Sequence, residues 1–175
     1  MIQQINFKNV RKEDSHTTDI SYLIDYYNKN GHFPLFQQVL IETRTDCNNN
    51  CPFCPHHFNK KKLGVMTWEC YCHIIDSLCE IGYNGRVALM ISNEPLLEDR
   101  LIKMIKYAKE KSPRLFLDIT TNGILLSLDK VDQLFRIGID NININDYRGD
   151  RDSNPDGLSK NLQPIYDAYY NNVKI

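Results

Sequence analysis

An alternation of strand-like and helix-like segments constrains the fold of this 175-residue chain more than any other feature. Apolar runs typical of buried parallel strands alternate with segments whose apolar residues recur at helical spacing. The expected strands cover residues 39–43, 87–91, 115–120 and 141–145. The expected helices cover residues 17–30, 68–81, 99–111, 128–137 and 162–171, and Thr67 and Ser127 are expected to cap two of them.

Repeated strand–helix units predict a parallel sheet with helices on its outside, and right-handed crossovers curve such a sheet. The expected fold is therefore α/β, a partial parallel (β/α) barrel of the TIM-barrel type with about four to five strand–helix units. Residues 173–175 resemble the beginning of a fifth strand. We expect residues 1–36 to be an N-terminal, partly helical extension and residues 37–175 to be the core.

Three cysteines lie in one short loop directly after the first expected strand. Cys47, Cys51 and Cys54 have the spacing C-x3-C-x2-C, which is typical of a metal site. The irons of a [4Fe–4S] cluster usually each take one cysteine thiolate, so three cysteines leave one iron open for a substrate or cofactor. The other three cysteines lie in the segment 68–81 and are expected to pack as small apolar residues.

Composition excludes several classes of protein. The formal net charge of −1 offers no broad basic field for nucleic acid. We find no apolar run long enough to cross a bilayer and no signal-peptide pattern, so the expected location is the cytoplasm, without membrane association. In that reducing compartment, clustered cysteines are more often metal ligands or catalytic groups than disulfides.

Polar turns follow the other expected strands. These turns are Ser92-Asn93-Glu94-Pro95, Thr121-Asn122-Gly123 and Asn145-Asp146. Because the chemistry of parallel barrels lies at the carboxyl ends of the strands, all three turns and the cysteine loop are expected to meet at one mouth. The alternation of residues 141–145 places three asparagines on one face, where a polar cofactor would supply partners.

These motifs, in this order, resemble the radical S-adenosylmethionine (SAM) superfamily over roughly residues 37–147. The resemblance rests on the cysteine loop, on Asn93-Glu94-Pro95-Leu96-Leu97 and on Thr121-Asn122-Gly123. The first half looks most like members that carry a C-terminal SPASM domain, although the auxiliary-cluster domain itself is expected to be absent. Many members have Gly-Gly-Glu-Pro where this chain has Ser-Asn-Glu-Pro.

The resemblance implies an enzyme. Cys47, Cys51 and Cys54 would hold a [4Fe–4S] cluster whose open iron binds SAM. Reductive cleavage of SAM would give a 5′-deoxyadenosyl radical that abstracts hydrogen from a peptide or small-molecule substrate. A reductant protein such as flavodoxin or ferredoxin would supply the electron.

The resemblance also assigns residues to the cofactor. Phe53 would lie near the adenine, and the turn Ser92-Asn93-Glu94-Pro95 would offer backbone groups to the methionine amino group. Thr121 and Asn122 would lie near the ribose. Asn145, at the end of its strand, is the best candidate on that strand for contact with SAM.

Other readings of the same sequence stay open. The chain could activate a glycyl-radical enzyme, or it could be a non-catalytic module that carries a cluster. A closed zinc site made by the loop cysteines with His56 or His57 is a further alternative. A half-open parallel sheet also leaves an unpaired edge, so we expect a second copy or a partner chain to cover residues 141–145 or 173–175.

Overall fold

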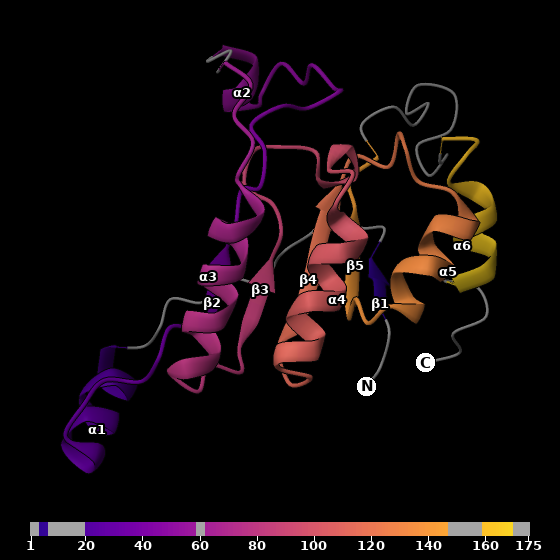
Figure 1. Ribbon diagram of the computed structural model, residues 1–175. Helices are drawn as coiled ribbons and strands as arrows, with labels where there is room; N and C mark the ends of the chain where they lie inside the picture. Colours follow the sequence, from indigo (N-terminus) through magenta and orange to yellow (C-terminus); the bar gives the residue numbers. More distant parts are fainter. Residues whose placement is uncertain (1–3, 7–19, 59–61, 147–158, 170–175) are drawn as a thin grey trace.

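The computed structural model describes residues 4–6, 20–58, 62–146 and 159–169 and contains one five-stranded parallel sheet in the order β1-β5-β4-β3-β2 (Figure 1). The strands are β1 (Gln4–Asn6), β2 (Gln38–Leu40), β3 (Arg86–Ala88), β4 (Phe116–Thr121) and β5 (Asn141–Ile144). The helices are α1 (Ile20–Asn30), α2 (Pro55–Phe58), α3 (Trp68–Glu80), α4 (Leu101–Lys111), α5 (Leu128–Arg136), α6 (Gln163–Tyr169) and the 3-10 turn η1 (Pro95–Leu97).

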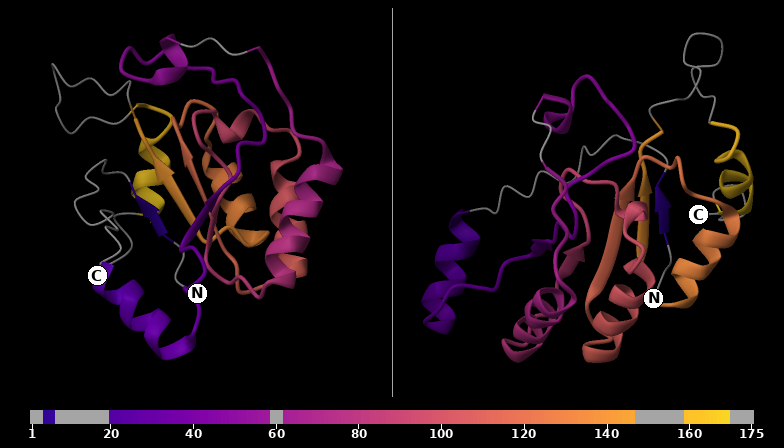
Figure 2. Two further views of the ribbon diagram at one scale, coloured as in Figure 1. Left: turned by 90° about the vertical axis from the view of Figure 1, so that its left-hand side faces the viewer. Right: turned by 45° about the horizontal axis from the view of Figure 1, so that its top comes forward.

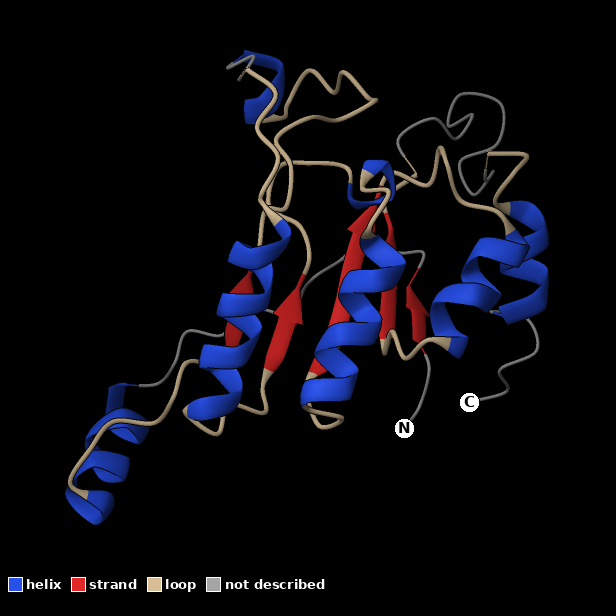
Figure 3. Ribbon diagram, in the orientation of Figure 1, coloured by secondary structure: helices blue, strands red, loops and turns tan. Residues whose placement is uncertain are grey.

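Helices α3, α4 and α5 lie side by side along one face of the sheet, and α6 packs beside α5 (Figures 1 and 3). Four strand–helix units therefore follow one another from β2 to α6, which confirms the expected partial barrel of α/β type. No helix in the described ranges is long and apolar enough to cross a membrane.

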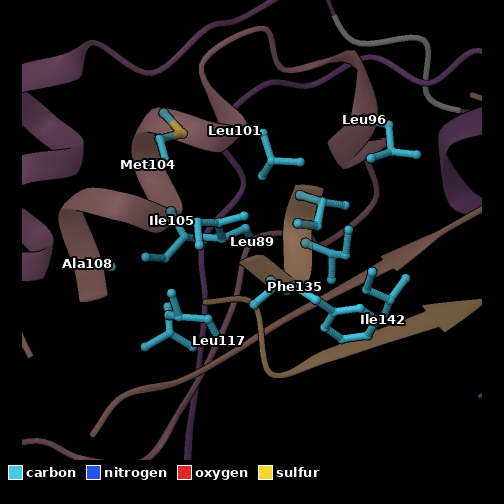
Figure 4. Close-up of a cluster of buried hydrophobic side chains, with 14 of the residues drawn as sticks. Leu89, Leu96, Leu101, Met104, Ile105, Ala108, Leu117, Phe135 and Ile142 are labelled. Carbon is cyan, nitrogen blue, oxygen red and sulfur yellow. The ribbon is translucent and has the colours of Figure 1, made fainter. Parts of the chain in front are cut away.

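The core lies between the sheet and this helix layer. Alternate residues of β3, β4 and β5 point toward the helices, as the period of two in a strand requires. Figure 4 shows the meeting of the two sets of side chains, which include Leu89, Leu117 and Ile142 near the strands and Leu101, Met104, Ile105, Ala108 and Phe135 on the helices. The apolar spacing predicts inward residues on both of the following helices, namely Leu101, Ile102, Met104, Ile105 and Ala108 on α4 and Val131, Leu134 and Phe135 on α5. The structure confirms all of these except Ile102, which is only partly buried.

The face of α3 that enters the core is rotated from the expected one. The apolar spacing of residues 68–81 predicts an inward stripe of Trp68, Cys72, Ile75 and Cys79, flanked by Tyr71, Ile74 and Leu78. The structure instead buries Tyr71, Ile75 and Leu78, while the three cysteines of α3 are half-buried or exposed. The Tyr71 hydroxyl donates to the carbonyl of Met104 at 2.9 Å, which satisfies the polar end of the ring and lets it occupy the centre of the stripe.

The expectation of an open edge at β5 is wrong for this chain. Residues Gln4–Asn6, within the expected N-terminal extension, form β1 and pair in parallel with Asn141–Asn143 of β5. The chain thus covers its own β5 edge, and no second copy is needed there. Residues 173–175 lie outside the described ranges.

Helix α1 stands apart from the sheet (Figures 1 and 2). Its apolar spacing predicted a buried stripe, but the side chains of Ile24 and Tyr27 are 52% and 47% exposed. Tyr27 contacts the ring of Phe33, with ring centroids 4.9 Å apart. The periodicity correctly predicted a helix but not which surface its apolar stripe contacts.

The predicted N-cap of α3 provides a local test of the fold. The Thr67 hydroxyl accepts a hydrogen bond from the backbone N–H of Cys70 at 3.1 Å. Thr67→Ala should lower the free energy of unfolding by about 1 kcal/mol, because one N–H of the first turn loses its partner. Urea denaturation measures the change, and Thr67→Ser is the matched control that keeps the cap. Equal stability of the alanine and serine variants would contradict it.

Candidate active site at the carboxyl edge of the sheet

Hydrogen bonds join the loops that follow β2, β3, β4 and β5 at the carboxyl edge of the sheet. The N–H of Glu94 donates to the carbonyl of Asp46 at 3.0 Å, which links the turn after β3 to the cysteine loop. The N–H of Asn145 donates to the carbonyl of Thr121 at 2.9 Å, which links the ends of β5 and β4. The structure therefore brings together the four motifs that the sequence placed at one mouth.

Glu94 is the centre of this network. The residue is 2% exposed, and its carboxylate accepts from the hydroxyl of Thr121 at 2.6 Å and from the N–H of Asn122 at 2.8 Å. The N–H of Leu96 donates to it at 3.0 Å and begins the η1 turn. One buried carboxylate thus fixes the turn after β3 against the end of β4.

Asn122 carries the link from Glu94 to the cysteine loop. Its Nδ2 donates to Oδ1 of Asn48 at 2.8 Å and lies 3.7 Å from the sulfur of Cys47. Hydrogen bonds to sulfur tune the electronic properties of metal-bound thiolates. Asn122 is therefore placed to position Cys47 and to stabilise negative charge on it.

The carboxylates of Asp46 and Glu42 fix the cysteine loop and the turn after β3 through further hydrogen bonds. Arg44 binds both carboxylate oxygens of Asp46 and also donates to the carbonyl of Leu97. This bidentate contact holds the pKa of Asp46 below its usual range. Glu42 accepts from the N–H and the hydroxyl of Ser92, at 3.1 and 2.7 Å. The residues on either side of the mouth are thus fixed before any ligand binds.

The three loop cysteines are free thiols, each half-buried. Burial raises the pKa of Cys47 and of Cys51, and the neighbouring thiols raise that of Cys51 further. Across the described ranges, no group of three or more His, Cys, Asp or Glu side chains is close enough together to form a metal site. The donor set is of the right chemistry for iron–sulfur ligation, but the thiols do not converge on one point.

Phe53 and His56 lie in and beside the cysteine loop. The Phe53 ring is 65% exposed. His56 lines a cavity of about 380 Å³ together with Asp46, Cys47, Leu63 and the intervening asparagines. The side chain of His57 lies outside the described part of the structure.

The sequence did not identify Asp46 and Asn48 as site residues. Both are neighbours of Cys47 and have ordinary loop composition, so their roles follow from pairing across the fold. One feature of the sequence could have indicated a role for Asp46, since it lies two residues after the oppositely charged Arg44. No feature of the sequence could have indicated a role for Asn48, because its hydrogen-bond partner Asn122 is 74 residues away.

The sequence matches the family model of the Radical SAM superfamily over residues 41–146, which is more than half of the chain. The chain belongs to the radical SAM superfamily. The family implies SAM and an iron–sulfur cluster as cofactors. The matched segment begins at the residue after β2 and ends just after β5, so it contains all four of the loops described above.

Two curated proteins are similar to part of the chain. An S-adenosyl-L-methionine-dependent 2-deoxy-scyllo-inosamine dehydrogenase of Niallia circulans is 28% identical over 116 residues, which are 66% of this chain and 46% of the relative. A PqqA peptide cyclase of Granulibacter bethesdensis is 27% identical over 108 residues, 61% of this chain and 28% of the relative. The chain thus spans about half the length of these relatives or less.

Solved structures of BtrN have the same fold. A complex of BtrN with AdoMet and 2-DOIA superposes with a TM-score of 0.67 at 27% identity, covering 77% of this chain and 52% of BtrN. BtrN in an open conformation gives a TM-score of 0.58 at 23% identity, covering 65% of this chain and 58% of BtrN. This chain therefore has the same arrangement of strands and helices as BtrN over the superposed residues.

The buried carboxylate of Glu94 predicts a pH-dependent stability difference. Burial raises the pKa of Glu94, against the opposing effect of its three hydrogen bonds. A carboxyl group with a raised pKa in the folded state stabilises the fold below its unfolded pKa, and this contribution is lost as the pH rises through the folded pKa. Glu94→Gln should therefore gain stability relative to the wild type as the pH rises from about 4 to 7.

Denaturation of both proteins across this pH range measures that difference. Thr67→Ser is a suitable reference variant, because it changes no titratable group. A stability difference between wild type and Glu94→Gln that moves in the opposite direction with pH would contradict a raised pKa at Glu94.

Proposed function

We propose that this chain is a radical SAM enzyme that binds a [4Fe–4S] cluster through Cys47, Cys51 and Cys54. The observation that carries the proposal is the hydrogen-bond network around Glu94, which joins the cysteine loop to two further family motifs. When bound, the cluster and SAM would supply a reductive cleavage to methionine and a 5′-deoxyadenosyl radical that would abstract a hydrogen atom from the substrate.

The protein's own residues would bind and orient these groups. The free thiols of the loop supply the ligands, and we infer that cluster insertion draws the three sulfurs together. The Ser92–Pro95 turn would hold the methionine amino group through its backbone. Thr121 and Asn122 would lie near the ribose, although both already take part in the Glu94 network.

Phe53 and Asn145 are two further residues proposed to contact SAM. Phe53 would cover the adenine, and its 65% exposure leaves the ring accessible to a ligand. Asn145 would contact SAM from the end of β5, where its backbone is fixed to Thr121. A reductant protein such as flavodoxin or ferredoxin would supply the electron. The reaction would take place in a reducing compartment such as the cytoplasm.

The substrate would bind over the sheet face that points away from α3, α4 and α5. On β4, Leu117 and Ile119 enter the core, so the alternate residues Asp118 and Thr120 point to the other face. There Nδ2 of Asn143 lies 3.4 Å from the Thr120 hydroxyl and 3.5 Å from Asp118. Asp118 itself is buried and paired with Arg86, so the half-buried amide of Asn143 is the polar group that a substrate could reach on this face. Such a group favours a substrate rich in hydroxyl or amino groups, such as the 2-deoxy-scyllo-inosamine in the name of the Niallia circulans dehydrogenase, over an apolar peptide side chain.

Anaerobic reconstitution with iron and sulfide tests the cofactor part of this proposal. We expect about four irons and four sulfides per chain. We also expect the electron paramagnetic resonance spectrum of the reduced protein to change when SAM is added. A protein that takes up zinc instead of iron, or a spectrum unaffected by SAM, would overturn the proposal in favour of a structural metal site.

A further inference from the structure

Asn93 carries a buried hydrogen-bond donor that has no acceptor in the described part of the protein. The residue is 7% exposed, and its Oδ1 accepts from the N–H of Ile91 at 3.0 Å. That contact fixes the orientation of the amide, so Nδ2 is the donor end. Nδ2 finds no partner among the described residues. Because an unsatisfied buried donor costs free energy, a native fold usually provides such a group with a ligand or a water.

The backbone around Asn93 is held firmly on both sides. Ser92 is bound to Glu42, two residues after β2, through both its N–H and its hydroxyl. Glu94 is bound through its N–H to the carbonyl of Asp46, the residue before Cys47. Asn93 therefore lies in the turn beside the loop that would hold the cluster, and its amide cannot move far to find another partner.

The chemistry of the amide selects which part of SAM it can bind. The methionine end of SAM carries an amino group and a carboxylate. A carboxamide nitrogen donates and does not accept, so Nδ2 cannot bind the amino group but suits the carboxylate. Resting on the proposed function, we infer that Nδ2 of Asn93 donates a hydrogen bond to the carboxylate of the methionine moiety of SAM.

This contact distinguishes the chain from members with glycine at the same position. In a Gly-Gly-Glu-Pro turn, no side chain is available to donate. None of the described non-glycine residues has a positive φ, so Ser92 and Asn93 adopt ordinary backbone conformations. The side chain at position 93 thus adds a donor to the turn without backbone strain.

Binding of two ligands to the anaerobically reconstituted, unreduced protein tests the inference. The ligands are SAM and decarboxylated SAM, which lacks the carboxylate, and equilibrium dialysis gives both dissociation constants. Asn93→Asp replaces the amide donor by a carboxylate of the same size, which would repel the carboxylate of SAM. It should weaken SAM binding at least about tenfold, equivalent to ~1.4 kcal/mol, and leave decarboxylated SAM bound as tightly as before or more tightly.

Asn93→Gly is the second variant, because it removes the donor without adding charge. We expect about a tenfold loss for SAM, equivalent to ~1.4 kcal/mol, and less than about a twofold change for decarboxylated SAM. Thermal melting of both variants checks that they fold. Equal losses for the two ligands, or no loss for either, would overturn the role of Asn93. A wild-type protein that binds a cluster but no SAM would overturn the proposed function itself.

Discussion

Replacing Cys51 by alanine is expected to abolish cluster-dependent cleavage of SAM. Three cysteines are the minimum that holds three irons of a [4Fe–4S] cluster, so the loss of one leaves two irons without a protein ligand. Cys51 is the middle residue of the loop, and the pKa of its thiol responds to both Cys47 and Cys54. The expected result is loss of iron on desalting and no 5′-deoxyadenosine above background. The same outcome is expected for Cys47→Ala and Cys54→Ala.

Cys72→Ala is the matched control for this series. Cys72 is also a free, half-buried thiol, but it lies on α3, outside the cysteine loop. Its replacement should retain full iron content and activity and lower the free energy of unfolding by about 1–2 kcal/mol through lost packing. Full activity in Cys51→Ala, or loss of the cluster in Cys72→Ala, would contradict the assignment of the ligands.

Arg86→Met should be the most destabilising single change outside the mouth. The Asp118 side chain has no exposed surface, and Arg86 binds both of its oxygens, at 2.8 and 2.5 Å. Removing the guanidinium leaves a buried carboxylate whose one remaining side-chain contact among the described residues is the long 3.5 Å hydrogen bond from Nδ2 of Asn143. Breaking such a pair typically costs about 3–5 kcal/mol, and urea denaturation of the variant measures it.

Two further variants show whether the loss comes from the unpaired charge. Arg86→Met combined with Asp118→Leu should recover much of the stability, because no buried carboxylate is then left without a partner. Lys111→Met breaks the exposed ion pair with Asp76 and should change stability far less. An Arg86→Met loss no larger than that of Lys111→Met would show that Asp118 is not held by Arg86.

The helices and strands of the core could be predicted because each repeats its own local pattern. The cap residues Ser127 and Thr67 and the buried face of α5 follow from the spacing of side chains within one segment. The meeting of four loops at one edge was also predictable, since parallel strands have all their carboxyl ends on the same side.

Pairing between distant segments could not be predicted. β1 has three residues and pairs with a strand 137 positions away, and nothing in Gln4–Asn6 indicates its partner. For the same reason, the sequence identified Glu94 as a motif residue but not as a buried acceptor of three hydrogen bonds. The exposed apolar side of α1 is a second example. The helical spacing of its apolar residues predicts a helix, but it does not predict the surface against which that helix packs.

The measurement that tests the central claim most directly is 5′-deoxyadenosine formation by the reconstituted wild-type protein, given SAM and a strong reductant under anaerobic conditions. We predict that 5′-deoxyadenosine and methionine form in equal amounts and that both disappear when Cys47, Cys51 and Cys54 are all replaced by alanine. A protein that holds the cluster and binds SAM, yet forms no 5′-deoxyadenosine with any reductant, would contradict the account.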